Sequence, residues 1–199
     1  MTLLHALDLL STFVFALVGA RVAADRGLDY GGIAFIATIA SVSGGTLRNV
    51  FLGILPIWIT DIWVLASVLA AVIITLSFRR VTHVGKTLLI MDTFGLAVAT
   101  LSGAQLALQV SVPWYSSILL GVITAVTGGL LRDVLCQVEP VLLHRETIGT
   151  SALVGAATFI ALHEVGIAQA PSVIAGGLVV IATRVISIYF DLHLPKFKN

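Results

Sequence analysis

Two stretches of the chain, SGGTLRNVFLGILP (43–56) and TGGLLRDVLCQVEP (127–140), repeat one pattern at an offset of 84 residues. The same offset, applied without a gap, places Asp8 on Asp92. Apolar helices always share Leu and Val, but that likeness does not bring a Gly pair, an Arg and a Pro into register. We therefore interpret the chain as two copies of one structural unit.

The composition indicates that both copies lie in a membrane. The 199 residues are 58% hydrophobic and only 11% charged, whereas soluble domains are about 25% charged. A soluble core does not account for this excess, because too little polar surface remains to cover it. A bilayer accounts for it directly, since lipid is itself an apolar solvent. The net charge of +1 supplies no basic field for a nucleic-acid partner.

The sequence carries no pattern typical of catalysis or of a metal site. Cys136 is the only cysteine, and the five histidines are scattered without the spacing of a zinc site. A nucleophile elbow, a phosphate-binding loop and the HExxH pattern are all absent. We therefore expect no enzymatic activity, no metal and no cofactor.

Seven stretches have the length and apolar character of membrane spans, for which about 20 mainly apolar residues are needed. They cover residues 3–24, 31–55, 58–78, 87–109, 112–137, 147–165 and 170–190. Each copy then holds three helices, and an odd number forces the second copy to enter the membrane upside down. The predicted fold is all-α and integral to the membrane, an inverted repeat of two three-helix bundles plus a seventh helix.

The chain, 1–199, is thus interpreted as a single membrane domain. Repeat one covers residues 3–78, repeat two covers residues 87–165, and helix seven covers residues 170–190. Lys and Arg in short loops collect on the cytoplasmic side of a membrane. Here they collect on one side of the predicted topology, at Arg26, Arg79, Arg80, Lys86, Arg145, Lys196 and Lys198. This asymmetry predicts an N-terminus outside and a C-terminus in the cytoplasm.

Each repeat has a small-Gly-Gly step in the middle of its second span, Ser43-Gly44-Gly45 and Thr127-Gly128-Gly129. Glycine costs a helix about 1 kcal/mol relative to alanine, and Gly pairs are sites of kinking. Carbonyls freed by a kink must be met by protein, water or an ion. We expect two broken helices that line a path for a small polar species. The alternative is close helix packing, but two symmetry-related pairs, each followed by an Arg, favour the path.

Arg48 and Arg132 follow these steps and are costly within a span, at about 2.5–3.5 kcal/mol each. Partial snorkelling to the interface is an alternative to burial. Within each repeat an Asp shares the depth and the side of the Arg. We therefore predict two ion pairs, Arg48 with Asp8 and Arg132 with Asp92, one near each mouth of the path. Their immediate neighbours, Asn49 and Asp133, are further candidate charge partners.

At the two stretches quoted first, the sequence resembles the prokaryotic members of the trimeric intracellular cation (TRIC) channel family. The resemblance extends over both repeats and helix seven. It implies seven helices, a homotrimer, and one pore per subunit where the second and fifth helices kink at a glycine triplet. By this resemblance the pore is lined by the residues of the two Gly-Gly steps and the two arginines. It also implies a bacterial inner membrane, with membrane lipids as partners.

Two features bear on the resemblance. Ser43 and Thr127 replace the first glycine of each triplet, so their hydroxyls stand where the family has no side chain. Small residues recur at Gly95, Ala99 and Gly103 in the fourth span and at Ser151 and Gly155 in the sixth. Such stripes indicate close helix packing, and with the resemblance they predict a trimer.

Three functions compete. The leading one is a monovalent cation channel of the potassium type, which also admits sodium, although two arginines beside a cation path repel cations unless they are paired. The second is a secondary transporter of a small zwitterion such as glycine, in which Arg binds the carboxylate and freed carbonyls bind the ammonium. The third, a structural or assembly protein, does not account for buried arginines.

Overall fold

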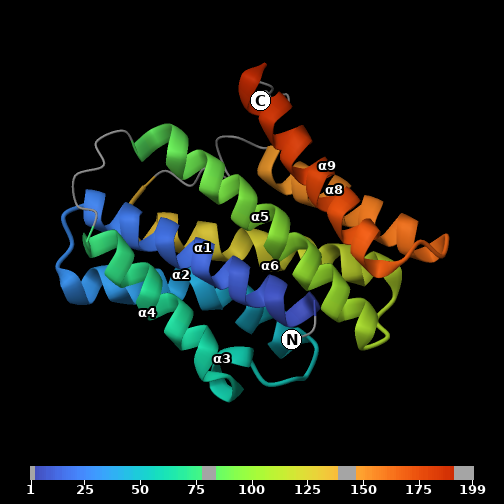
Figure 1. Ribbon diagram of the computed structural model, residues 1–199, viewed down its shortest axis with the longest axis horizontal. Helices are drawn as coiled ribbons and strands as arrows, with labels where there is room; N and C mark the ends of the chain where they lie inside the picture. Colours follow the sequence, from blue (N-terminus) through green and yellow to red (C-terminus); the bar gives the residue numbers. More distant parts are fainter. Residues whose placement is uncertain (1–2, 78–83, 139–146, 191–199) are drawn as a thin grey trace, which may run out of the picture.

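The computed structural model describes residues 3–77, 84–138 and 147–190, which form eight helices and no strand (Figure 1). In chain order they are α1 (Leu3–Asp25), α2 (Tyr30–Phe51), α3 (Ile57–Thr60), α4 (Ile62–Ser77), α5 (Val84–Gln109), α6 (Trp114–Leu135), α8 (Thr147–Glu164) and α9 (Gln169–Tyr189). Five of them are long and apolar enough to cross a membrane, namely α1, α2, α5 from Thr87, α6 and α9. The all-helical membrane fold predicted from the sequence is therefore present.

The predicted third span, 58–78, is not one helix in the structure but two, α3 and α4, separated at Asp61. Asp61 has an extended backbone, with φ −128° and ψ 108°. Its carboxylate accepts a hydrogen bond from the backbone N–H of Trp63 at 2.9 Å, which caps the start of α4. The apolar composition continues across this break, so hydropathy alone does not detect it.

Seven of the eight helices pack as two groups of three with one helix added, and the short α3 contacts α4 and α2 of the first group. In the first group α1 contacts α2 and α4, and in the second group α5 contacts α6 and α8. The groups meet where α1 packs on α5 and α2 packs on α6, while α9 lies against α8 and α5. In Figure 1, α3 and α4 lie at one side of the molecule and the α8–α9 pair at the other.

The helix ends repeat at the same 84-residue offset as the sequence. At the end of α2, Gly53 has φ +68° and the Ile54 N–H bonds to the Asn49 carbonyl at 3.0 Å. At the end of α6, Gln137 has φ +52° and the Val138 N–H bonds to the Asp133 carbonyl at 2.9 Å. Both are Schellman caps with a left-handed residue just past the helix. They explain why α2 and α6 end sooner than predicted.

The small-residue stripes are used inside the subunit. A Cβ added to Gly95 would contact Val14 at 3.1 Å, and one added to Gly103 would lie 2.6 Å from the Thr124 hydroxyl. Gly155 faces Val180 of α9 in the same way. These stripes do indicate close packing, but they are occupied by neighbouring helices of one chain. They therefore give no support to the trimer that was partly predicted from them.

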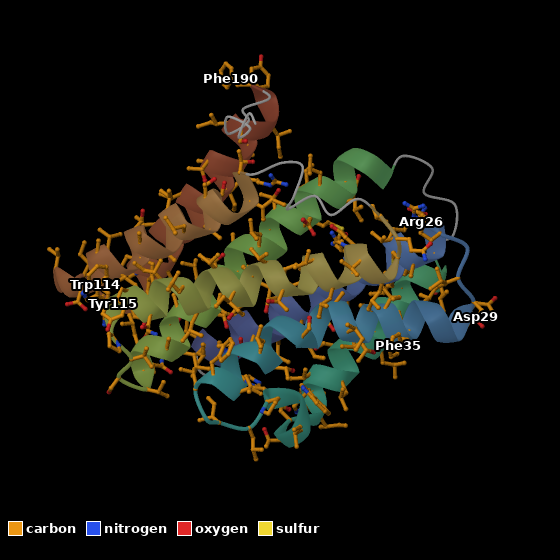
Figure 2. The ribbon with its side chains drawn as sticks, turned by 180° about the vertical axis from the view of Figure 1, so that it is seen from behind. Arg26, Asp29, Phe35, Trp114, Tyr115 and Phe190 are labelled. Atoms are coloured by element: carbon orange, nitrogen blue, oxygen red, sulfur yellow. The ribbon has the colours of Figure 1, made fainter. Side chains whose placement is uncertain are left out.

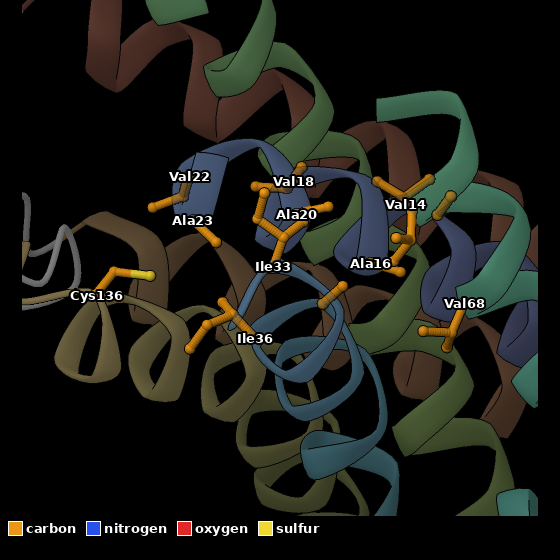
Figure 3. Close-up of a cluster of buried hydrophobic side chains, with 13 residues drawn as sticks. Val14, Ala16, Val18, Ala20, Val22, Ala23, Ile33, Ile36, Val68 and Cys136 are labelled. Atoms are coloured by element: carbon orange, nitrogen blue, oxygen red, sulfur yellow. The ribbon is translucent and has the colours of Figure 1, made fainter. Parts of the chain in front are cut away.

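Apolar side chains occupy both the interior and the surface. In Figure 3, Val14 and Val18 of α1 meet Ile33 and Ile36 of α2 and Val68 of α4 in one buried cluster. The outer faces of the helices also expose large apolar side chains, among them Ile62, Leu69, Ile174 and Leu178. An apolar exterior of this kind fits a lipid environment.

Polar and aromatic residues mark the two ends of the bundle. Trp114 and Tyr115 lie at one end, and Arg26 and Asp29 lie at the opposite end (Figure 2). The two aromatic side chains are 59% and 56% exposed, as in an interfacial aromatic belt. Five other positions used to predict the orientation lie outside the described residues: Arg79, Arg80, Arg145, Lys196 and Lys198.

Candidate functional site

The two Gly-Gly steps are the places where α2 and α6 touch backbone to backbone. A Cβ added to Gly44 would overlap the carbonyl oxygen of Thr124, and one added to Gly128 would overlap the carbonyl oxygen of Ala40. These two contacts are related by the 84-residue offset, since it carries Gly44 to Gly128 and Ala40 to Thr124. The glycines are required here because any side chain would push the helices apart.

The break expected at these steps is not observed. Both α2 and α6 are continuous helices through residues 43–45 and 127–129. A Gly pair permits a break, but here the α2–α6 contact stabilises the helical conformation of both. The expectation of broken helices was therefore wrong, and the close-packing alternative accounts for Gly44 and Gly128.

The second glycine of each step has a different environment. A Cβ added to Gly45 would find Arg48 Nη2 as its nearest neighbour at 3.9 Å, and one added to Gly129 would find Arg132 Nη2 at 3.8 Å. These distances are ordinary van der Waals contacts. Gly45 and Gly129 thus lie beside the arginines with room for a Cβ, while Gly44 and Gly128 hold the helices together.

Arg48 is buried in a hydrogen-bonded group that includes the predicted partner. Its Nη1 lies 3.0 Å from Asp8 Oδ1, and its Nη2 lies 3.3 Å from Asp8 Oδ2. Nη1 also donates to the Ser102 hydroxyl at 2.9 Å, and Nε donates to Asn49 Oδ1 at 2.9 Å. The Arg48 side chain is 1% exposed in this structure, so snorkelling does not describe it.

Arg132 makes the equivalent contacts in the second group of helices. Its Nη1 lies 2.7 Å from Asp92 Oδ1, the second predicted ion pair. Its Nε donates to Asp133 Oδ1 at 2.8 Å, where Arg48 has the neutral Asn49. Both predicted Asp–Arg pairs are therefore present, and the two arginines differ in how many carboxylates surround them.

Two small cavities adjoin these arginines. The Arg48 cavity, of about 40 Å³, is lined in part by Asp8, Gly44, Gly45, Arg48 and Gly128. The Arg132 cavity, of about 20 Å³, is lined in part by Asp92, Gly129, Arg132 and Asp133. Each has room for at least one water-sized molecule.

Phe15 of α1 lines both cavities and is 4% exposed. Its ring also lies near the step on α6, since a Cβ added to Gly128 would be 3.9 Å from Phe15 Cδ1. The position 84 residues later is Ala99, so the two repeats differ here. One aromatic residue therefore borders both cavities, beside the α2–α6 contact.

Two of the predicted path residues do not face these spaces. Among the described residues that line the two cavities, neither Ser43 nor Thr127 appears. The Thr127 hydroxyl donates to the Ile123 carbonyl of its own helix at 2.6 Å. The first residue of each step therefore lies off the cavities, and the hydroxyls do not alter their lining.

The sequence did not identify three residues that the structure brings into the interior. The Ser102 hydroxyl accepts from Arg48 and donates to Asp8 Oδ1, but its repeat equivalent is Val18, so the repeat did not identify it. Nothing in the sequence distinguishes Phe15 from an ordinary core residue. Arg184 of α9 is 1% exposed, and its Nη1 donates to the Thr147 hydroxyl at 3.1 Å.

Comparison with known proteins relates both halves of the chain to one family. A family model described as "Glycine transporter" matches residues 5–79 and 89–164, two segments whose starts are again 84 residues apart. The chain is 30% identical to a "UPF0126 membrane protein" of Vibrio cholerae, over 98% of this chain and 83% of that one. It is 29% identical to the "UPF0126 inner membrane protein YadS" of Escherichia coli K12, over 98% of this chain and 96% of that one.

Solved structures confirm the resemblance to TRIC channels. A TRIC trimeric intracellular cation channel orthologue from Rhodobacter sphaeroides matches with a TM-score of 0.90 and 34% identity, over 96% of this chain and all of that one. A second structure, described by the words "Structural basis for conductance through TRIC cation channels", matches with a TM-score of 0.85 and 29% identity. It covers 100% of this chain and 98% of that one. Structure and sequence thus relate the chain to membrane proteins of one fold.

Proposed function

The chain belongs to the family whose model is described as "Glycine transporter", and from this membership and its TRIC fold we propose that it is a monovalent cation channel. Each subunit carries its own path, which conducts potassium and sodium ions. The observation that carries the proposal is the pair of cavities beside the α2–α6 contact, each lined by one of the two Asp–Arg ion pairs. Structures named as TRIC cation channels share the fold over nearly the whole chain.

The proposed path runs from the Arg48 cavity to the Arg132 cavity. The two cavities share Phe15, and glycines of the steps line both, Gly44, Gly45 and Gly128 in the first and Gly129 in the second. An ion passing between them moves along the α2–α6 contact and past the Phe15 ring. The small volumes, about 40 and 20 Å³, indicate a narrow state in which an apolar ring limits hydration.

The charges near the path favour a cation, despite the two arginines. Asp8 balances Arg48, so that group carries no net formal charge. Asp92 and Asp133 together outnumber Arg132 by one negative charge. Carboxylates within a few ångströms suppress the repulsion that an isolated guanidinium would exert. Because each arginine has a carboxylate partner, the two arginines do not prevent a cation from using the path.

We further infer seven spans and an inverted repeat, with α3 and α4 together forming one span. The repeated caps, the repeated ion pairs and the reciprocal Gly44 and Gly128 contacts support this inference. An odd number of spans per repeat then inverts the second copy. The whole chain acts as one membrane domain, because the two groups of helices pack on each other through α1–α5 and α2–α6.

The remaining parts of the proposal concern assembly and location. We infer a homotrimer from the fold shared with a structure described as a trimeric channel. We place the chain in a bacterial inner membrane, since one relative is named an inner membrane protein. The loop that holds Arg26 faces the cytoplasm, and Trp114 lies at the outer interface.

The name of the family model favours a second candidate, a carrier of glycine or a similar zwitterion. In that mechanism an arginine binds the carboxylate of the solute. The Nε, Nη1 and Nη2 atoms of Arg48 already donate to Asn49, Ser102 and Asp8. A solute carboxylate would have to displace Asp8 from a buried pair, which is costly. The channel is therefore the better supported function.

Purified protein in a planar lipid bilayer distinguishes the two. In symmetric KCl a channel gives discrete current steps of constant size. A glycine carrier gives saturable uptake of labelled glycine into proteoliposomes and no steps. Protein inactivated by heat before reconstitution is the control in both assays. Saturable glycine uptake without steps would overturn the proposal.

A further inference from the structure

A third cavity lies away from both arginines, where α5 ends and α9 begins. It has a volume of about 140 Å³ and is lined by Gln105, Leu108, Gln109, Phe159, His163 and Gln169. The chain has four glutamines, and three of them line this one space, the fourth being Gln137. We call the cavity the glutamine pocket.

Gln105 has hydrogen-bonding capacity that the described protein atoms do not satisfy. Its side chain is 2% exposed, and both Nε2 and Oε1 are buried without a hydrogen-bond partner. A buried amide in this condition is unfavourable, because it has lost water and gained no replacement. Such a group, in contact with an open cavity, indicates a molecule that supplies both a donor and an acceptor.

The equivalent position in the first repeat also borders a cavity, of about 430 Å³, but the residues there are charged. The 84-residue offset carries Arg21 to Gln105 and Asp25 to Gln109. Arg21 Nε and Asp25 Oδ1 form an ion pair at 3.1 Å. The second repeat replaces both charged residues with amides, and the Gln105 amide is not paired with Gln109. An ion pair beside one cavity is therefore replaced by uncharged amides beside the other.

The lining also defines the charge of the molecule that fits. The described lining residues include no carboxylate, lysine or arginine, and His163 is stacked on Phe159 with ring centroids 6.2 Å apart. An ion would lose its hydration in this pocket without gaining an opposite charge. An uncharged polar molecule meets the amides with hydrogen bonds alone.

We propose that the glutamine pocket binds a small uncharged molecule with a hydrogen-bond donor and acceptor side by side, of which a primary carboxamide is the simplest. The Gln105 Nε2 donates to the carbonyl oxygen of the ligand, and Gln105 Oε1 accepts from its N–H. Gln109 and Gln169 supply further donors and acceptors, and the Phe159 ring covers an apolar substituent. Binding in the glutamine pocket does not depend on ion conduction, so this proposal is tested independently of the channel proposal.

The test uses the full-length protein in detergent, with ¹⁵N in the glutamine side chains. Only four pairs of NH₂ signals arise, and Gln137, which is outside the described lining of the pocket, serves as an internal control. Titration with acetamide should shift the signals of Gln105, Gln109 and Gln169 saturably, and Gln137 should not move. Acetone, which has the carbonyl without the N–H donors, should produce a shift at least several-fold smaller at equal concentration.

Two variants make the result decisive. Gln105→Leu should abolish the saturable shifts at Gln109 and Gln169, and the double variant Gln105→Arg with Gln109→Asp should do the same at Gln169 by recreating the ion pair of the first repeat. Should either fail to fold, Gln169→Leu at the pocket rim should weaken binding at least several-fold with folding intact. Shifts that do not saturate, that include Gln137 equally, or that persist in Gln105→Leu would overturn the proposal.

Discussion

Asn49 and Asp133 occupy equivalent positions in the two repeats, and each accepts a hydrogen bond from Nε of the preceding arginine, at 2.9 Å and 2.8 Å. The geometry is the same, but the charge is not. Arg48 therefore has one carboxylate partner and a neutral amide, whereas Arg132 has two carboxylates. The two ends of the proposed path thus differ by one formal negative charge.

This asymmetry makes cation preference depend on Asp133. Asp133→Asn keeps the shape and recreates the arrangement of the first repeat, but it removes the excess negative charge. We expect the ratio of potassium to chloride permeability to fall roughly tenfold, which corresponds to about 1.4 kcal/mol. The reversal potential in a KCl gradient measures the ratio. The matched variant Asn49→Asp should raise the ratio, and no change in either variant would show that these residues do not face the path.

The two glycines of each step should respond in opposite ways to alanine. Gly44→Ala places a methyl group on the Thr124 carbonyl, so overpacking of about 1–3 kcal/mol should exceed the gain in helix propensity. Gly45→Ala meets its nearest neighbour at 3.9 Å and should leave the thermal transition unchanged or slightly raised. Thermal unfolding in detergent compares the two. Equal transition temperatures in the two variants would contradict the close backbone contact between Gly44 and Thr124.

Removing one partner of the Asp8–Arg48 ion pair should destabilise the protein more than removing both. Asp8→Ala leaves a buried guanidinium without its carboxylate, and we expect a loss of about 3–5 kcal/mol in the free energy of unfolding. The double variant Asp8→Ala with Arg48→Met removes both charges and should recover most of that loss. Denaturation of the unmodified protein, the single variants Asp8→Ala and Arg48→Met, and the double variant in one detergent gives the cycle. Additive losses would mean that the pair contributes no coupling.

Orientation in the membrane can be tested at two exposed residues of the described chain. In a Cys136→Ser background, Tyr115→Cys should react with an impermeant thiol reagent added to intact cells. Arg26→Cys, at the opposite end of the bundle (Figure 2), should react only after the membrane is opened. The reverse pattern would invert the predicted topology.

Some parts of the fold and of the candidate site were predictable from the sequence, and others were not. The ion pairs of Arg48 and Arg132 were predicted because a charge in a span needs a partner and the repeat supplies two examples of the same pairing. The split at Asp61 was not predicted, since it depends on one side-chain cap within an apolar run. The ends of α2 and α6 were also missed, although Gly53 with its positive φ is a typical C-terminal signal.

The Gly-Gly steps show the limit of local reasoning most clearly. Glycine pairs weaken a helix, so a break was expected from helix propensity alone. The outcome depends instead on what faces each glycine, and the carbonyls of Thr124 and Ala40 face Gly44 and Gly128. Phe15 was missed for a related reason, because only the packed structure reveals that one buried ring adjoins two cavities.

Assembly provides a further check that does not depend on conduction. The exposed apolar faces and the fold shared with a trimeric channel lead us to expect three copies per particle. Native mass spectrometry of protein released from detergent measures the copy number directly. A homogeneous monomer or dimer at all detergent concentrations would contradict the trimer.

The most direct test of the central claim is the unitary current of Gly45→Leu and Gly129→Leu in a planar bilayer. These glycines line the two cavities, and a Cβ added to either would make only an ordinary contact with the neighbouring arginine, so a Leu side chain should fill the path without separating α2 from α6. We predict discrete potassium currents from the unmodified protein and loss of those currents in each variant. Both variants should elute as the unmodified protein does on size exclusion. Unchanged unitary currents in both correctly folded variants would contradict the account and place conduction elsewhere.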